Sequence, residues 1–539
     1  MFSFRTVYEP DLGWHLAHGR ENLAGRIVHT NVFNAFYADY PQPFTSWLWD
    51  SAAYVSWRVG GDVGVQVFQW LLLFAAFVVA YLACRKRSTA LPALSILILG
   101  FLVLEPRAIP RPHVASFVGM AACALLIERA IVKRSATPLW WAVPVIILWS
   151  NAHTESAFGV LFIGLFGLGE LIRPSVLDRG ESMRVLAIAA ISAVALFATP
   201  YGWGIVRYLR ENVEMTASLD IAELRPAYLP VYRGFFVYLG ITLVLLVTQP
   251  RRLALWELAV TVFFGALGWR YLRQTPLVFF ATAPMVAMRL TTLAERGIDA
   301  RAVLVTVLAS AMFISRVPPT TFISNFRAGD IFPSSFFSQT AITFIRERGL
   351  QGSVFNSNNL GGWLAWKLYP QVRVFQDSRM QATPPEHVRR ILDATSQGAW
   401  DALVGGVDWA VVSTPRVNQL SGVGRFPVST WATVYWDDAI EIVARRSGRY
   451  RTLATEREYR IVTSDSSVST LLTALSSSSG PQIIEEARWN RADNPRGFVS
   501  AAVLCVAGES AACDDVDRLA QSDRSRAADA ALVRIFRKQ

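Results

Sequence analysis

A dense group of titratable side chains opens the chain in the segment VYEPDLGWHLAHGR, residues 7–20. Glu9 and Asp11 flank Pro10, and a proline favours an extended backbone in the residue before it. Side chains two positions apart on an extended segment point to the same side, so both carboxylates can face one site. Such a pair can hold a divalent cation, or it can act as a base and an orienting group. His15 follows Asp11 by one helical turn if a helix begins there.

Asp11 also has a simple structural role. Aspartate is a preferred residue at the N-cap of a helix, and Asp11 directly precedes the helical pattern LGWHLAHGR. From the residues alone, capping and catalysis are equally good interpretations of this side chain.

Further arginines and histidines lie in EPRAIPRPH, WSNAHTESAFG and GWRYLRQTP, which connect long apolar stretches. They are Arg107, Arg111, His113, His153, Arg270 and Arg273. The guanidinium fork matches phosphate oxygens, although arginines at a membrane interface also extend there without binding a ligand. A single histidine such as His153 is more often structural than a ligand. Together these side chains predict a site for an anionic lipid headgroup, with a carboxylate that activates a nucleophile.

The composition indicates a membrane protein. Of the 539 residues, 53% are hydrophobic and 17% are charged, and the mean hydropathy is +0.32. Soluble domains carry about 25% charged residues. The net charge of +11 comes from basic residues that lie mostly between apolar stretches. This distribution fits membrane topology and gives no reason to expect a nucleic-acid partner.

About ten apolar stretches approach the roughly 20 residues of a membrane-crossing helix. They are 62–83, 90–105, 113–128, 139–150, 156–172, 184–199, 234–249, 254–268, 276–293 and 302–317. Basic residues follow every odd-numbered stretch, as in RKR at 85–87, and the positive-inside rule places those connections in the cytoplasm. The N-terminal polar group, the even-numbered connections and the chain beyond 317 are then predicted on the outer face of the cytoplasmic membrane.

The segment before the first stretch, 44–60, combines aromatic side chains with Asp50 and Arg58. This mixture predicts an amphipathic helix on the membrane surface rather than a span. Residues 1–320 are therefore predicted to form one transmembrane domain.

The composition changes beyond residue 320. Strand and helix patterns predict a soluble α/β domain over 330–462, with a helix over 383–404. A serine-rich linker and a helical appendage over 480–539 follow. Cys505 and Cys513 can pair if this region lies outside the cytoplasm, but their spacing alone does not decide this.

The order of the polar motifs resembles that of a group of bacterial polytopic membrane proteins placed with the GT-C glycosyltransferases. EPDLGWHLAHGR is similar to the group's D-x-D-x-W-W-H-L-x-x-G-x signature. RPH, LWSNAHTESAFG, TPYGW, ELRP, RYLRQTPL and NNLGGWLAWKLYPQVRVFQDSR are similar to its later motifs. The resemblance covers about residues 1–445. Each motif is weak by itself, but their common order is specific to the group.

The resemblance implies a mostly α-helical GT-C bundle with a C-terminal soluble α/β domain. It also implies transfer of a sugar, with inversion, from a polyprenyl-phosphate donor to a glycan, lipid or protein acceptor. The reaction would take place at the outer face of the bacterial cytoplasmic membrane.

Individual roles follow from the same resemblance. Asp11 would be the catalytic base, Glu9 a helper or a ligand of a divalent metal ion such as Mg²⁺ or Mn²⁺, and His15 a third member of the acidic motif. Arg270 and Arg273 are the first candidates for the lipid phosphate. The further substrate contacts would be Arg107, Arg111, His113, His153 and Trp14.

The chain departs from the group at three places. Gly13 replaces the first tryptophan of the signature, which would open room near the site, and Thr199 replaces an asparagine in TPYGW. The group has a transmembrane helix before the acidic loop, whereas eight residues precede Glu9 here. We expect that the usual first helix is encoded upstream; a true gap would weaken the case for activity.

Two other functions fit parts of the sequence. A transporter or flippase for a lipid-linked glycan would also gather arginines, but it should carry polar residues along a path through the bilayer, and the predicted spans are nearly free of charge. A catalytically inactive membrane scaffold is the second alternative. In the α/β domain we find no nucleotide-binding loop and no nucleophile–base pair, and we expect Asp377 and Arg379 to stabilise that domain or its docking rather than act in catalysis.

Overall fold

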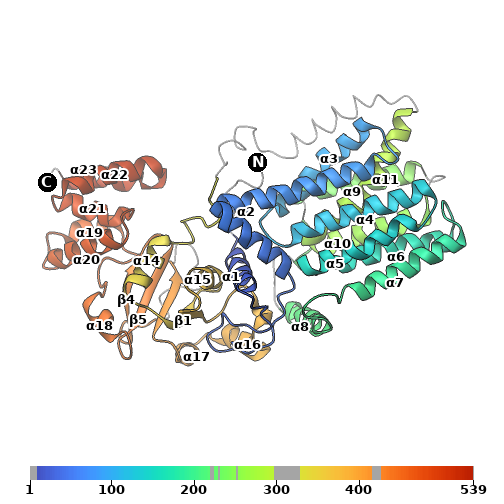
Figure 1. Cartoon of the computed structure of the whole chain (residues 1–539). Coiled ribbons are helices and arrows are strands. Elements are labelled where there is room, and N and C mark those ends of the chain that lie inside the picture. Colours follow the sequence, from blue (N-terminus) through green and yellow to red (C-terminus); the bar gives the residue numbers. More distant parts are fainter. Residues whose placement is uncertain are drawn as a thin grey trace. The chain divides into compact units, whose positions relative to one another are not determined.

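The computed structural model describes residues 9–218, 224–228, 231–249, 253–295, 328–414 and 426–537. The chain forms two compact units, whose elements are labelled in Figure 1. The helical unit comprises Met1–Glu9, His18–His29 and Pro41–Ile331, and the sheet unit comprises Pro10–Ala17, Thr30–Tyr40 and Phe332–Gln539. Helix α1, Leu12–Leu23, contributes its first half to the sheet unit and its second half to the helical unit.

Long apolar segments form the helices of the helical unit. They are α2 (Trp47–Cys84), α3 (Ala90–Leu104), η2 (Glu105–Arg107), α4 (His113–Lys133), η3 (Thr137–Trp141), α5 (Ala142–Ala152), α6 (Ser156–Ile172), α7 (Arg179–Ala195), α8 (Gly204–Ser218), α9 (Arg233–Thr248), α10 (Leu255–Arg270), η6 (Leu272–Gln274) and α11 (Thr275–Glu295). Each predicted stretch from 62–83 to 276–293 coincides with a helix, and 302–317 lies outside the described residues.

Within the described part of the chain, four helical segments are long and apolar enough to cross a membrane. They are Trp47–Cys84, Ala90–Arg107, His113–Lys133 and Leu272–Glu295. These segments mark a membrane protein by length and composition, and the number of about ten spans stays a prediction.

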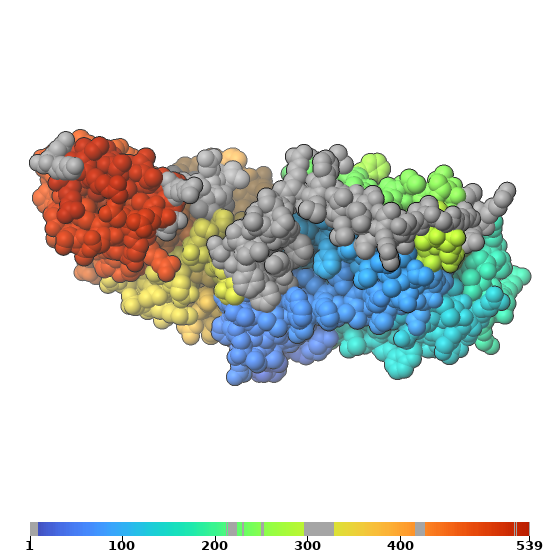
Figure 2. All heavy atoms as spheres, turned by 90° about the horizontal axis from the view of Figure 1, so that it is seen from above, coloured from blue at the N-terminus to red at the C-terminus, as the bar shows by residue number. Residues whose placement is uncertain are grey.

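Helix α2 is bent in its first half. Gly60 and Gly61 have non-helical backbone angles, and Gly61 has a φ of 56°, which favours glycine. The predicted surface helix 44–60 and the first predicted span are therefore the two arms of one bent element. Part of α2, in blue, lies at the surface of the helical unit in Figure 2.

Helices α4 and α11 form the centre of the helical unit. In their most apolar windows 72% and 78% of the residues are buried, compared with 33% in α2. Glycines allow close packing around α4 and α6: a Cβ on Gly119 would lie 2.4 Å from the Trp149 ring, and one on Gly169 would lie 2.5 Å from Trp256. Small residues have this role at many helix contacts in membranes.

The helices carry more buried charge than the sequence patterns predict. Glu128, Glu170, Glu257 and Arg289 are all buried inside helices. The prediction of nearly charge-free spans was therefore wrong. A charge survives in such surroundings only with a partner, and the partners come from other parts of the chain.

These buried charges lie at one end of the helical unit, which we call the far end. Arg87 holds Glu128 through two hydrogen bonds of 2.5 and 2.6 Å. Arg289 of α11 forms a buried ion pair with Glu257 of α10. Glu170 accepts hydrogen bonds from the backbone amides of the 175–177 connection. The far end is thus fixed by local ion pairs and loop caps.

The sheet unit is built on a mixed sheet. Its strands are β1 (Gly352–Asn356), β2 (Val372–Val374), β3 (Trp409–Ser413), β4 (Trp431–Trp436) and β5 (Ile440–Arg445), in the order β2-β1-β3-β5-β4. The first three are parallel, and the β3–β5 and β5–β4 pairs are antiparallel. Every residue of β3 is buried, as expected for a central strand that is covered on both faces.

Helices precede, connect and follow these strands. They are α14 (Gln339–Glu347), η7 (Asn358–Leu360), α15 (Gly361–Leu368), η8 (Met380–Ala382), α16 (Pro385–Asp393), α17 (Gln397–Leu403) and α18 (Arg451–Glu456). The single helix predicted over 383–404 is in fact the pair α16 and α17. Ser396 interrupts the helical pattern because it caps α17, accepting a hydrogen bond from the Ala399 amide.

An early segment of the chain extends the sheet. The Val374 amide donates to the Phe33 carbonyl at 2.9 Å, and the Ala35 amide donates to the Val374 carbonyl at 2.8 Å. Asn34 adds a side-chain bond of 2.7 Å to the Phe375 carbonyl. Residues 30–40 therefore run beside the free edge of β2.

The C-terminal part is a helical layer: α19 (Val468–Ala474), α20 (Gly480–Asp493), α21 (Phe498–Val506), α22 (Ser510–Ser522), η11 (Arg524–Arg526) and α23 (Ala527–Phe536). A disulfide between Cys505 and Cys513 joins α21 to α22. The predicted serine-rich linker is partly helical, since Ser467 caps α19 and Leu471 and Leu472 are buried.

Candidate functional site

At the end of the helical unit opposite the far end, Glu9 is held by an arginine. Its side chain is buried, and Glu9 Oε2 lies 2.7 Å from Arg111 Nε. Arg111 belongs to the short connection between η2 and α4. We call this end of the unit the site end.

Two further predicted phosphate-binding residues flank this connection. Arg107 is buried at the end of η2, and His113 is the first residue of α4. His113 Nε2 donates to the Arg107 carbonyl at 2.8 Å. The sequence EPRAIPRPH thus folds back on itself, and it places the charges of Arg107 and Arg111 beside the start of the central helix.

A second group at the site end is centred on Glu155, in the connection between α5 and α6. Glu155 Oε2 lies 3.4 Å from His153 Nδ1, and Gln274 Nε2 donates to Glu155 Oε1 at 2.8 Å. His153 Nδ1 also lies 2.8 Å from Ser116 Oγ, which accepts a hydrogen bond from Trp149. The group joins α4, the α5–α6 connection and η6.

The electrostatics of this group favour an ionised carboxylate. Burial alone would raise the pKa of Glu155, but the charges of His153 and Arg273 outweigh it and lower the pKa to about 2. Glu155 therefore stays charged at neutral pH, where it pairs with His153 and attracts the charge of Arg273. This geometry can position cationic groups for an anion and can pass a proton between Ser116, His153 and Glu155.

The two candidate arginines after α10 differ in position. Arg273 acts electrostatically on Glu155, inside the group just described. Arg270 is exposed, stacks on Tyr271 with 4.8 Å between the guanidinium carbon and the ring centre, and donates to the Leu224 carbonyl at 3.4 Å. Arg273 thus lies close to the group centred on Glu155, whereas Arg270 points toward Leu224.

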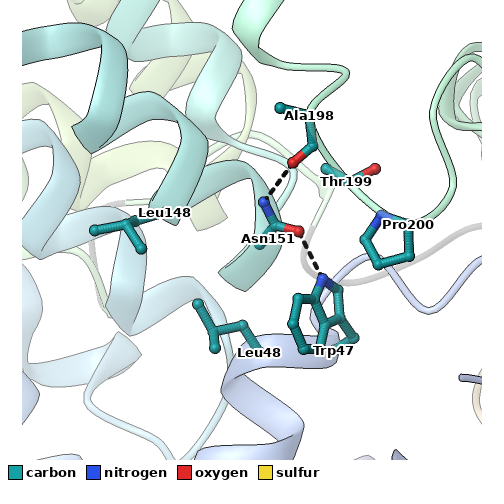
Figure 3. Close-up of a pocket in the computed structure, with 7 residues that line it drawn as sticks. All are labelled: Trp47, Leu48, Leu148, Asn151, Ala198, Thr199 and Pro200. Carbon is teal, nitrogen blue, oxygen red and sulfur yellow. Dashed lines mark hydrogen bonds between the residues drawn. The ribbon is translucent and has the colours of Figure 1, made fainter.

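A pocket opens beside the same connections (Figure 3). It is lined by Trp47, Leu48, Leu148, Asn151, Ala198, Thr199 and Pro200. Asn151 ties its walls together, because its side chain accepts from the Trp47 indole at 2.6 Å and donates to the Ala198 carbonyl at 2.9 Å. The pocket is mostly apolar, which suits a hydrocarbon chain better than a sugar.

A buried histidine–aspartate pair was not among the predicted site residues. His18 Nδ1 lies 2.6 Å from Asp50 Oδ2, and both side chains are fully buried. Ser46 donates to the other carboxylate oxygen at 3.0 Å. Asp50 in an otherwise aromatic segment was the only sequence signal for this pair. The pair joins the second half of α1 to the start of α2.

Asp11 is described within the sheet unit. It stands at the N-cap position of α1, where its carbonyl accepts from the His15 amide at 3.2 Å. Its carboxylate accepts a hydrogen bond from the Ser378 hydroxyl. Asp11 therefore does occupy the predicted N-cap position. Its side chain also contacts Ser378, which the sequence patterns did not indicate.

Trp14 and His15 follow on the same helix. Their rings lie 3.6 Å apart, and Trp14 is also covered by the Arg379 guanidinium at 4.9 Å. Arg379 forms a buried ion pair with Asp377 and donates to Asn31 at 3.0 Å. Asp377 and Arg379 therefore have a structural role: they hold the N-terminal segments against the sheet unit.

Gly13 does not open room near the site, in contrast to the expectation. A Cβ on Gly13 would lie 2.4 Å from the backbone of Gly362 in α15, and one on Gly362 would lie 2.6 Å from the Pro10 carbonyl. The space of a larger side chain is filled by the backbone of α15. Gly13 serves the close approach of α1 to that helix.

Glu9 and Asp11 are poorly arranged to bind the expected divalent metal ion. The Glu9 carboxylate is already paired with the Arg111 guanidinium, and a cation would have to displace that charge. Among the residues that the structure describes, no group of at least three histidine, cysteine, aspartate or glutamate side chains is arranged so that it could hold a metal ion. A metal dependence is therefore no part of the reaction proposed below.

The sequence and the structure were compared with those of known proteins. No model of a known protein family matches the sequence, and no curated protein sequence matches it. Solved structures do match. The archaeal oligosaccharyltransferase AglB from Archaeoglobus fulgidus, in complex with an inhibitory peptide and a dolichol-phosphate, aligns with a TM-score of 0.56 and 12% identity, over 82% of this chain and 71% of that one.

Its apo form aligns with a TM-score of 0.55 and 11% identity, over 80% of this chain and 70% of that one. ArnT from Cupriavidus metallidurans, bound to undecaprenyl phosphate, gives a TM-score of 0.47 and 14% identity, over 82% of this chain and 95% of that one. A further AglB structure contains zinc and sulfate. At this identity the AglB likeness shows the fold, and the predicted GT-C type of fold is thereby confirmed.

Proposed function

We propose that the chain is a membrane glycosyltransferase that moves a sugar from a polyprenyl-phosphate donor to an acceptor. The observation that carries the proposal is a cluster of arginine, histidine and carboxylate side chains at one end of a GT-C-type helical unit. The likeness to AglB, whose structure holds a dolichol-phosphate and a peptide, supports a lipid-linked donor. Because a fold hosts many functions, the site has to carry the argument.

The donor phosphate is assigned to the site end of the helical unit. Arg107, Arg111 and Arg273 supply the cationic groups there, and His113 and His153 supply further hydrogen-bond donors. Charges in such a partly dehydrated place act more strongly on a phosphate than they do in water. The hydrocarbon chain would then run along apolar helix surfaces in the membrane.

Asp11 is proposed as the base of the transfer. It takes the proton from the acceptor hydroxyl or amide while the acceptor atom attacks the anomeric carbon. The bond from that carbon to the phosphate oxygen breaks, and the polyprenyl phosphate leaves with the electron pair. One displacement of this kind inverts the anomeric centre. Glu9 is bound to Arg111 and is therefore proposed to orient that arginine, and His15 to position Asp11.

The membrane placement follows from the basic loops. We propose the bacterial cytoplasmic membrane as the location, with the site end and the sheet unit on the outer face. The far end, with Arg87 and the RKR segment, would then face the cytoplasm. The disulfide between Cys505 and Cys513 supports an oxidising surrounding for the sheet unit.

A flippase is the weaker alternative. It would need polar side chains along a path through the helices. The buried charges of the far end are instead engaged locally, as in the Arg87–Glu128 and Arg289–Glu257 pairs. Among the described residues these charges join helices to each other. This role supports a stable helical unit with a site at one end better than it supports a polar path.

The test is transfer of labelled sugar from polyprenyl-phosphate donors by the full chain in proteoliposomes, with envelope extract as the acceptor. We expect Asp11→Asn to lose about 10²–10⁴-fold in rate, which is the usual contribution of a general base. Asp39→Asn is the matched control, because Asp39 is an exposed aspartate of the same N-terminal region. It should transfer at the wild-type rate.

Two results would contradict this assignment. If Asp11→Asn transfers as fast as Asp39→Asn, Asp11 is not the base. If the wild-type protein moves labelled donor across the bilayer but releases no polyprenyl phosphate, the flippase alternative holds and the transferase proposal fails.

A further inference from the structure

Helix α8, Gly204–Ser218, carries an apolar face that the helical unit does not cover. Val206, Leu209 and Val213 follow each other at helical spacing and share one side of the helix, and Trp203 directly precedes its first residue. Their exposed fractions are 75%, 47%, 40% and 67%. In water such a row would cost about 25 cal/mol for each Å² of apolar surface left exposed.

The other sides of α8 differ in character. Ile205, at the start of the helix, is buried. Arg207 and Glu211 are charged and form an ion pair of 2.6 Å along the helix, and Arg210 is exposed. A helix with a tryptophan-containing apolar face bordered by arginines is suited to a lipid surface with anionic headgroups.

The apolar face of α8 continues the apolar surface of the neighbouring helix. Trp203 stacks on Phe197 with 4.1 Å between the ring centres, and Val194 near the end of α7 is 72% exposed. Figure 1 shows α8 following α7 at the edge of the helical unit. Tryptophan is enriched at the level of the headgroups, where a span ends.

We infer that α8 lies along the membrane surface, with the row from Trp203 to Val213 in the lipid. The occupant of this face is the bilayer itself, because the row is continuous with lipid-facing α7 and is bordered by basic side chains. The inference requires a membrane protein but is independent of the reaction proposed above.

This placement has a consequence for the site end. Before α8, the Ala198 carbonyl accepts from Asn151 at 2.9 Å. After it, the Leu272 amide donates to the Arg225 carbonyl at 3.0 Å, directly before Arg273. The chain on both sides of α8 is therefore tied to the elements that carry Glu155 and Arg273. A helix anchored in the headgroups would fix these elements at the depth of a lipid phosphate.

The experiment uses spin labels on single added cysteines in the full chain, at Val206 and Val213 on the apolar row and at Arg207 and Glu211 as controls. Cys84 and Cys123 are buried and Cys505 is paired with Cys513, and the unmutated protein measures any background labelling. The protein is placed in vesicles of phosphatidylethanolamine and phosphatidylglycerol. Collisions with oxygen, which prefers lipid, are compared with collisions with a water-soluble nickel chelate.

We expect a reversal of accessibility between the two pairs of positions. Labels at 206 and 213 should collide with oxygen more than with nickel, and labels at 207 and 211 should do the opposite. Nickel access at all four positions would overturn the inference, because the helix would then be in water. Shielding of 206 and 213 from both reagents would also overturn it, since a protein partner would then cover the face.

Discussion

Two buried glutamates show how neighbouring side chains determine whether a buried carboxyl group is ionised. Glu155 lies beside His153 and Arg273, and their charges outweigh burial, so its pKa is lowered to about 2. Glu441 of β5 has hydroxyl partners instead, Thr433 at 2.6 Å and Ser464 at 2.9 Å. Burial then dominates and raises the pKa of Glu441 to about 7. The first group is a fixed charge, and the second titrates near neutrality.

His387 of α16 is the opposite case to Glu441. It is buried between Tyr37 and Phe375, and burial, with a smaller contribution from Arg390, lowers its pKa from 6.5 to about 4. The unfolded chain therefore takes up this proton first, and stability is lost as the pH falls from 6.5 to 4. Glu441 acts the other way, because its stabilisation is full below pH 4.5 and is lost as the pH rises to 7.

We predict that the two contributions oppose each other and that single variants separate them. In His387→Phe, the free energy of unfolding should fall more steeply with rising pH between 4.5 and 6.5 than in the wild type, because the opposing contribution of His387 is removed. In Glu441→Gln, the free energy of unfolding should rise more steeply between pH 4.5 and 6.5, because the opposing contribution of Glu441 is removed. Each of these two pKa changes corresponds to at most about 3.4 kcal/mol. Denaturant unfolding of the full chain in detergent, followed by tryptophan fluorescence, measures this.

The control for these profiles is His29→Phe, because His29 is exposed. It should leave the pH profile as it is in the wild type. A profile of His387→Phe that is parallel to that of the wild type would show that His387 titrates alike in the folded and unfolded chain.

At the scale of elements, the contact of α1 with α15 explains why small residues occur in both. Gly13 and Gly362 bring two helix backbones together, and the Asp11–Ser378 and Arg379–Asn31 bonds fasten the same region. Asp11 is therefore held by the sheet unit as well as by its place in α1. The position of the proposed base depends on helix packing far from it in sequence.

We predict that Gly13→Ala destabilises this contact. Its Cβ would lie 2.4 Å from the Gly362 backbone, so α1 must shift, at a cost of about 1–3 kcal/mol. Gly398→Ala in α17 is the matched control, since a Cβ there meets nothing within 4 Å, and it should stabilise by about 0.5–1 kcal/mol. Unfolding of both variants in the full chain gives these values, and sugar transfer by Gly13→Ala should fall along with stability.

Equal stability of the two glycine variants would contradict the close approach of α1 and α15. Reduced transfer without reduced stability would instead show that Gly13 acts on the substrate directly.

At the scale of the whole molecule, both units include residues of the same N-terminal region. Residues 10–17 and 30–40 belong to the sheet unit, whereas 18–29 belong to the helical unit. Glu9 is consequently fixed by Arg111 of the helical unit, and Asp11 by Ser378 of the sheet unit. The acidic motif is thus not a free loop, since each carboxylate has a partner from a distant part of the chain.

The disulfide gives a prediction at this scale. If the sheet unit faces an oxidising compartment, the denatured, unreduced protein should bind thiol reagent at Cys84 and Cys123, and the reduced protein at all four cysteines. The double variant Cys505→Ser, Cys513→Ser should lose about 2–3 kcal/mol in the C-terminal helices, because the bridge closes a short loop. Labelling of four cysteines without reduction would argue against the outer-face placement.

Much of the fold could be predicted because the local patterns were strong. Apolar stretches such as 113–128 and 276–293 are long enough to determine a helix by themselves, and short β-branched runs such as DWAVVST determine a strand. Residues 467–475 were misread because serine is typical of linkers, although here Ser467 caps a helix whose leucines are buried. Helix α2 was predicted as two elements because Asp50 and Arg58 distinguish 44–60 from the apolar stretch that follows; in the structure the two are joined by a bend at Gly60 and Gly61.

The candidate site could be predicted only as a set of residues. By themselves, the motifs indicated Glu9, Asp11, the arginines of EPRAIPRPH and the histidine of WSNAHTESAFG, since polar groups in apolar surroundings stand out in composition. Which of them meet was decided by tertiary structure alone: Glu9 with Arg111, Glu155 with Gln274, Asp11 with Ser378 and His18 with Asp50. Helix and strand formation depends on neighbours in sequence, whereas an ion pair depends on how distant elements pack.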